Sequence, residues 1–196
     1  MAVLCEGISV IVRRDSIDEY FAGGWAAFEA LVPNATLCTD GELARVGFME
    51  PGGVEHFVSD LVLRGLVFYG DECHPEDIAV ADQVRGLTRP CDWLEYGRFG
   101  VGENPEDKVA MCWLYEGKRD LPGVIRLKSL SMELHAPPGW RYQGSLSQQF
   151  GFVPDEDRKD RLKFLRSEEK LDVYLDRATG KEVFVGRSGR TPKTVN

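Results

Sequence analysis

A short run of β-branched and small apolar residues, 77–83 (Asp-Ile-Ala-Val-Ala-Asp-Gln), constrains the fold of this chain more than any other stretch. Charged residues bound the run on both sides, which is typical of a buried strand whose ends reach the surface. The residues before it alternate between strand and helix patterns. We therefore expect this run to close a sheet built from the first 83 residues.

Five further elements are expected before that strand. In chain order they are a strand near 8–13, a helix near 16–31, strands near 36–39 and 43–49, and a helix near 51–64. Asp40-Gly41 favours a hairpin between the two middle strands, because both residues tolerate positive φ. Gly23-Gly24 weakens the first helix and marks a position where it can break.

With 78–82 added, the element order over about 7–83 is β-α-β-β-α-β. This is the ferredoxin-like split βαβ arrangement, so the predicted fold class is α+β. Unrelated functions share this arrangement, and it therefore indicates no particular activity.

Residues 84–196 form a second unit that is richer in strands. The patterns predict a hairpin from 93–99 and 109–115, a long strand over 124–134, a charged surface helix near 155–170, and a final hairpin from 171–175 and 182–185. The composition changes near 84–91, but this stretch is too short to separate two mobile bodies. We expect units 1–83 and 84–196 to pack as one continuous structure.

Charge is distributed unevenly between the two units. Residues 1–83 contain 15 Asp and Glu, four Arg and no Lys, which gives a net charge of −11, whereas residues 84–196 carry +3. Phosphate contacts need clustered Lys and Arg, so the first unit is not expected to bind nucleic acid. An acidic field of this kind steers a basic protein partner. The helix positions that fall away from the apolar stripes, and so face such a partner, are Asp18, Glu29, Glu55 and Asp60.

The five cysteines, Cys5, Cys38, Cys73, Cys91 and Cys112, are odd in number and widely spaced. No secretory signal is recognisable, and no apolar run is long enough for a membrane span. We therefore expect a cytoplasmic protein with free thiols and no disulfide framework. Cys73-His74 lies in an acidic loop, but no second ligand pair accompanies it, so neither a metal nor a cofactor is predicted.

Two sets of residues in the second unit are candidates for binding. Trp140 follows a Pro-Pro-Gly turn and, with Tyr142, is the best candidate for an exposed binding aromatic. An alternative site would be a pocket between the two units, formed by Cys91, Asp92, Glu95 and His135. A nucleophilic cysteine there would need a base, and His135 is the only histidine beyond residue 83.

The sequence contains no catalytic motif. The leading hypothesis is a non-enzymatic binding protein, and one concrete version is an immunity or antitoxin-type protein that masks a basic partner. The alternative is an enzyme or a small-molecule-binding domain with a pocket between the units. A third option is a subunit of a larger assembly.

Overall fold

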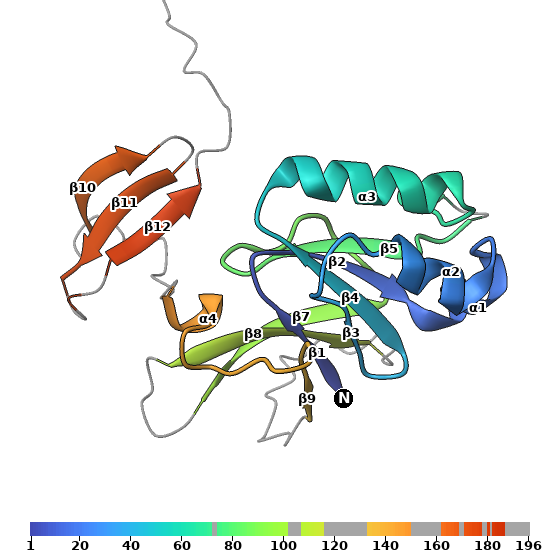
Figure 1. Ribbon diagram of the computed structural model, residues 1–196, viewed down its shortest axis with the longest axis horizontal. Helices are drawn as coiled ribbons and strands as arrows, with labels where there is room; N and C mark the ends of the chain where they lie inside the picture. The colour runs from blue at the N-terminus through green and yellow to red at the C-terminus, as the bar shows by residue number, and fades with distance from the viewer. Residues whose placement is uncertain are drawn as a thin grey trace, which may run out of the picture.

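The computed structural model describes residues 1–71, 74–101, 107–115, 133–149, 162–168, 171–177, 180 and 182–186. It confirms the α+β class, with helices and three sheets. Figure 1 shows three helices on one side of a five-stranded sheet and a second sheet on the other side. A third, three-stranded sheet is formed by the C-terminal strands.

The five-stranded sheet contains the elements expected in the first unit. Strand β2 (Ile8–Arg13) lies between β4 (Leu43–Phe48) and β5 (Ile78–Asp82), and all neighbours are antiparallel. The edges are β3 (Cys38–Thr39), shorter than predicted, and β6 (Gly86–Leu87), which was not predicted. The order β3-β4-β2-β5 is compatible with the expected split arrangement, and β5 coincides with the predicted closing strand.

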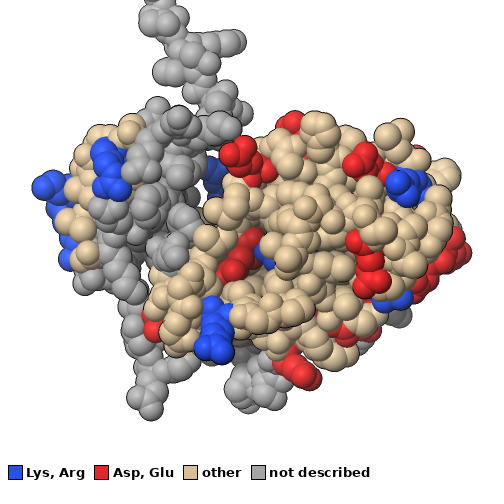
Figure 2. Space-filling model, viewed as in Figure 1, with Lys and Arg blue, Asp and Glu red and all other residues tan. Residues whose placement is uncertain are grey.

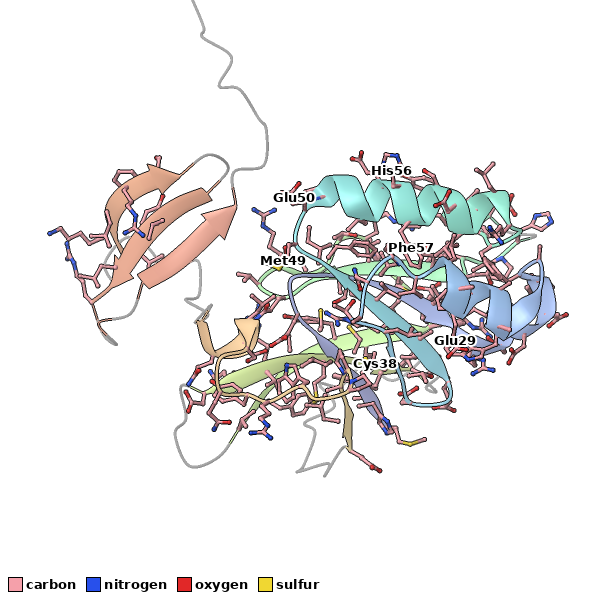
Figure 3. The ribbon with its side chains drawn as sticks, in the orientation of Figure 1. Glu29, Cys38, Met49, Glu50, His56 and Phe57 are labelled. Atoms are coloured by element: carbon pink, nitrogen blue, oxygen red, sulfur yellow. The ribbon has the colours of Figure 1, made fainter. Side chains whose placement is uncertain are left out.

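The helices cover one face of this sheet. The first helical segment breaks into α1 (Arg14–Tyr20) and α2 (Gly24–Leu31), because Gly23 and Gly24 both take positive φ. Helix α3 (Pro51–Leu63) begins with proline in its first turn, where the missing N–H costs no hydrogen bond. It buries Val54, Phe57, Val58 and Leu61 against the sheet. Figure 3 shows Phe57 pointing toward the sheet and His56 pointing away from it.

A strand at the start of the chain joins the two units, and the sequence patterns missed it. Strand β1 (Ala2–Cys5) is central in the second sheet, whose order is β7 (Leu94–Gly100), β8 (Lys108–Leu114), β1 and β9 (Leu134–His135). The hairpin of β7 and β8 was predicted correctly. The chain passes from β1 to β2, and thus between sheets, through Glu6 and Gly7 alone. Gly7 takes φ 61°, and a Cβ there would meet the carbonyl oxygen of Phe48 at 2.5 Å.

Small side chains allow the two sheets to approach closely. The cluster buried between the two sheets contains five of these small residues: Ala79, Ala81, Ala110, Cys5 and Cys112. The exception is Arg45, which points from β4 into this layer and is 2% exposed. Its guanidinium occupies space left by Gly47, where a Cβ would lie 2.5 Å from Arg45 Nη2.

The far face of the second sheet is covered by a segment that includes Ala136, Trp140 and Tyr142. The chain then forms the short helix α4 (Leu146–Gln149), where Ser147 N donates to the Glu6 carboxylate at the crossing between the sheets. Trp140 and Tyr142 pack on the far face against Leu4, Val109 and Met111. The molecule is therefore layered, with helices, five-stranded sheet, four-stranded sheet and cover in that order.

The C-terminal strands correct one expectation. Residues 162–168 form strand β10 rather than part of a charged helix, and they pair with β11 (Leu171–Asp176), which pairs in turn with β12 (Glu182–Gly186). The many charged residues suggested a solvated helix, but pairing with β11 decides the conformation. The hairpin of β11 and β12 was predicted correctly. The expected strand over 124–134 lies outside the described residues, apart from its last two positions.

Candidate partner-binding surface

Acidic residues occupy the outer face of the helical layer. Asp18, Glu29, Glu55 and Asp60 are all exposed, as their positions on the helices predicted. Asp18 forms an i,i+4 pair with Arg14 at 3.0 Å. Within the described part of the chain, Glu29, Glu55 and Asp60 form no ion pair, so their charges face solvent. Figure 2 shows carboxylates along α3 and around the α1–α2 end, where some Lys or Arg lies among them, and further Lys and Arg on the lobe that carries β10.

Apolar side chains are exposed at the C-terminal ends of α1 and α3. Leu63 is 84% exposed, Tyr20 55% and Val62 46%. We call Tyr20, Val62 and Leu63 the α1–α3 patch. Its two sides are held together because Ala22 N donates to Arg64 O at 2.9 Å. Gly65, at φ 111°, brings its backbone so close that a Cβ would lie 2.5 Å from Tyr20 O.

A buried carboxylate fixes the base of the patch. Asp77 accepts hydrogen bonds from Ser16 Oγ at 2.6 Å and from Val67 N at 2.8 Å, so it joins α1 to the loop after α3. Sequence reasoning treated Asp77 only as the charged boundary of the closing strand. Its burial at 5% exposure and its two partners give it a structural role instead.

Tyr20 is suited to contact a partner as a neutral side chain. Its phenol hydrogen-bonds with Glu19, and this contact together with the negative charge of Glu19 raises the pKa of Tyr20. The hydroxyl therefore stays protonated at neutral pH and donates to Glu19, and the side chain presents its apolar ring to solvent.

Trp140 and Tyr142 do not belong to this surface. Both are half-buried, and they lie on the far side of the second sheet from the helices. Trp140 Nε1 donates to the Glu6 carboxylate at 3.0 Å. Burial, followed by a hydrogen bond with Asp107, raises the pKa of Tyr142 to about 12. The expectation that Trp140 is an exposed binding aromatic was wrong, because the cover packs its ring onto β1 and β8.

The four residues of the alternative pocket are not brought together. Glu95 lies on β7 and His135 on β9, at opposite edges of the second sheet with β8 and β1 between them. Three strand spacings amount to roughly 14 Å. Asp92 is exposed, whereas Cys91 is buried. Burial, with a smaller contribution from Glu76, raises the pKa of Cys91 to about 12, so this thiol is protonated and a poor nucleophile.

The described residues provide no obvious metal centre. No group of three or more His, Cys, Asp or Glu among them is placed to hold an ion. His74 is exposed, and its Nδ1 lies 3.4 Å from Asp71. Its sequence neighbour Cys73 lies outside the described residues.

Comparisons with models of protein families, with curated proteins and with solved structures find no match to this chain. In the described regions no helix has both the length and the apolar character needed to cross a membrane. Of the candidate sites considered, the α1–α3 patch with the exposed carboxylates of the helical layer is the one best supported by the structure.

Proposed function

We propose that this chain is a non-enzymatic binding protein, and that its helical face takes a basic protein partner. The observation that carries the proposal is the exposure of Leu63 and Tyr20 in the same layer as Glu29, Glu55 and Asp60. An isolated exposed leucine is ordinary, but an apolar cluster rimmed by polar groups is typical of a protein interface. The absence of Lys from residues 1–83 leaves the carboxylates with few competing cations.

The two kinds of side chain have separate roles in this proposal. Exposed carboxylates act over about one Debye length, so they raise the rate of encounter with a basic partner. Leu63, Val62 and the Tyr20 ring supply the area that becomes buried once the partner has docked. An immunity or antitoxin-type protein that masks a basic toxin is one concrete form of this activity. Four buried free cysteines support a reducing, cytoplasmic location for it.

The test is a comparison of variants in a pull-down from the native host. Leu63→Asp removes apolar contact from the α1–α3 patch, and Phe164→Asp makes the same kind of change at a 52% exposed position on β10. We expect one stoichiometric basic protein to bind the wild type and the β10 variant, and to be lost with Leu63→Asp. A partner that is acidic, or that is retained by Leu63→Asp and lost with Phe164→Asp, would contradict the proposal.

A further inference from the structure

Two aromatic rings and a carboxylate from the loop between α3 and β5 surround a cation. The ring centroids of Phe68 and Tyr69 lie 4.8 Å apart, with the rings at 62° to each other. The guanidinium carbon of Arg89 lies over both rings, 4.2 Å from the centroid of Phe68 and 4.5 Å from that of Tyr69. Arg89 Nη2 also lies 3.5 Å from Glu76 Oε2. We call Phe68, Tyr69 and Glu76 the cation cage, because aromatic faces and a carboxylate are groups that attract a cation.

The loop itself brings the cage residues together. Gly70 lies so close to the returning chain that a Cβ there would meet Glu76 N at 2.6 Å. Asp77 N donates to Val67 O at 2.8 Å and closes the loop again beside Phe68. The cage is therefore built by the loop alone, whereas the cation in it, Arg89, comes from the segment after β6.

Arg89 is held in the cage by few contacts. Its side chain is 31% exposed, and its Nη2 makes both polar contacts, one to Phe68 O at 2.6 Å and the longer one to Glu76. Its Nε and Nη1 donate to no described residue. Tyr69 is 75% exposed, so solvent and a partner both reach the cage. The Arg89 side chain can therefore move into solvent with the loss of these contacts and the two ring contacts only.

The cage lies close to the α1–α3 patch. Phe68 follows Leu63 by five residues, a span of at most about 18 Å. Asp77 anchors both sites, because one of its oxygens accepts from Ser16 Oγ of α1 and the other from Val67 N, next to Phe68. A protein docked on the patch therefore has the cage within reach.

We propose that the cation cage sets the specificity of the partner-binding surface, and that a lysine or arginine side chain of the basic partner enters it in place of Arg89. This inference rests on the proposed function. Exchanging one cation for another keeps Glu76 paired and both rings covered, while Arg89 regains water and rotamer freedom, so the exchange costs little. A neutral or acidic side chain cannot replace Arg89 in this way, and the cage discriminates against partners that lack a cation at this position.

Arg89 has a role in the free protein as well. Glu76 is 19% exposed at its side chain, and Arg89 is its ion-pair partner among the described residues. A half-buried carboxylate without a cation is unfavourable. Arg89 therefore stabilises the cage until the partner supplies a cation of its own.

The cage is tested first without a partner, on the full chain, with tetramethylammonium chloride as the probe. Arg89→Gln removes the cation, while its amide can still donate to Phe68 O and keep the loop in place. With isotope-labelled Phe and Tyr rings, we expect saturable NMR shifts at Phe68 and Tyr69 in this variant, and about tenfold weaker binding of the probe to the wild type. Neopentyl alcohol, a neutral molecule of the same shape, should give no saturable shift.

Two further measurements complete this arm. Tyr69→Leu added to Arg89→Gln should abolish binding of the probe, whereas Phe164→Leu, at an exposed aromatic on β10, should leave it unchanged. In the wild type the probe should shift the Nε–H signal of Arg89 as it leaves the cage, so the test does not depend on the folding of a variant. No shift of that signal at high probe concentration, or equal binding of the probe to wild type and folded Arg89→Gln, would overturn the cage.

Use of the cage by the basic partner is measured separately, as dissociation constants at high salt. Arg89→Gln should bind the partner several-fold more tightly, and Tyr69→Leu several-fold more weakly. Arg64→Gln is the matched control, because it also removes an exposed cation, one that lies 5.8 Å from a single ring, that of Phe21. Equal gains for Arg89→Gln and Arg64→Gln would overturn the exchange and leave the proposed function intact. A pull-down that yields no basic protein would overturn the proposed function and the exchange together, whereas the probe decides the cage independently.

Discussion

The indole Nε1 of Trp140 donates a hydrogen bond of 3.0 Å to the carboxylate of Glu6, 134 positions earlier in the chain. The other oxygen of the same carboxylate accepts from Ser147 N at 2.8 Å. The Glu6 carbonyl oxygen accepts a hydrogen bond from Arg45 Nη2. Glu6 therefore connects the cover, the crossing between sheets and the buried arginine.

Replacing Glu6 by Gln should destabilise the fold. The amide keeps the shape of the side chain but loses the charge that strengthens the hydrogen bonds from Trp140 and Ser147. One of these donors can then face the amide NH₂ group, which cannot accept its hydrogen bond. We expect a loss of about 1–3 kcal/mol in the free energy of unfolding, measured by urea denaturation. Glu29→Gln, at an exposed carboxylate, should change it by less than about 0.5 kcal/mol. Equal effects of the two substitutions would refute the role of Glu6.

Two glycines of the first unit should respond oppositely to alanine. At Gly47 the new Cβ would lie 2.5 Å from Arg45 Nη2, and the buried guanidinium is held by hydrogen bonds to Ser9, Glu6 and Thr36, so Gly47→Ala should cost more than about 2 kcal/mol. At Gly52, in the first turn of α3, no atom lies within 4 Å of the new Cβ. Gly52→Ala should therefore be neutral or stabilising by up to about 1 kcal/mol. Melting temperatures of both variants measure the difference.

Stability should decline as the pH rises above about 8.5. Burial raises the pKa of Cys38 to about 11 and, with a smaller contribution from Glu76, that of Cys91 to about 12. Unfolded thiols ionise near pH 8.5, so above that pH the unfolded chain releases protons that the folded protein retains. The stabilisation is complete below about pH 8.5 and is lost toward the folded pKa values. Cys91→Ala should make the decline between about pH 8.5 and 9.5 shallower in urea titrations, and an unchanged slope would contradict the assignment.

Charge reversal on α3 should affect the rate of partner association rather than stability. Glu55→Lys with Asp60→Lys places two cations in the acidic helical face, so association with a basic partner should slow several-fold and depend less on salt. The melting temperature should barely change, because both carboxylates are exposed. Glu133→Lys, at an exposed carboxylate outside the helical layer, is the control. Association rates that are equal for wild type and double variant across a salt series would end the electrostatic part of the proposal.

The sequence was most informative where a local pattern coincided with a local structure. The alternation around Val10, the Gly23-Gly24 break and the apolar stripe of α3 all predicted elements that the structure contains. Strand β1 was missed because four apolar residues, buried on both faces, show no alternation, and their partners lie beyond residue 107. The exposure of Trp140 was misjudged for the same reason, because its hydrogen-bond partner Glu6 lies far from it in the sequence.

The position of β1 also matters while the chain is being synthesised. Residues 8–87 contain every strand of the five-stranded sheet, so that sheet can form early in translation. Val3 and Cys5 must wait for Cys112 and Ala110 to leave the ribosome before β1 can take its central place. Until then, Ile11, Ala79 and Ala81 remain uncovered on the open face of the nascent sheet. Long-range pairing of this kind slows folding and leaves apolar surface accessible to chaperones or to other nascent chains.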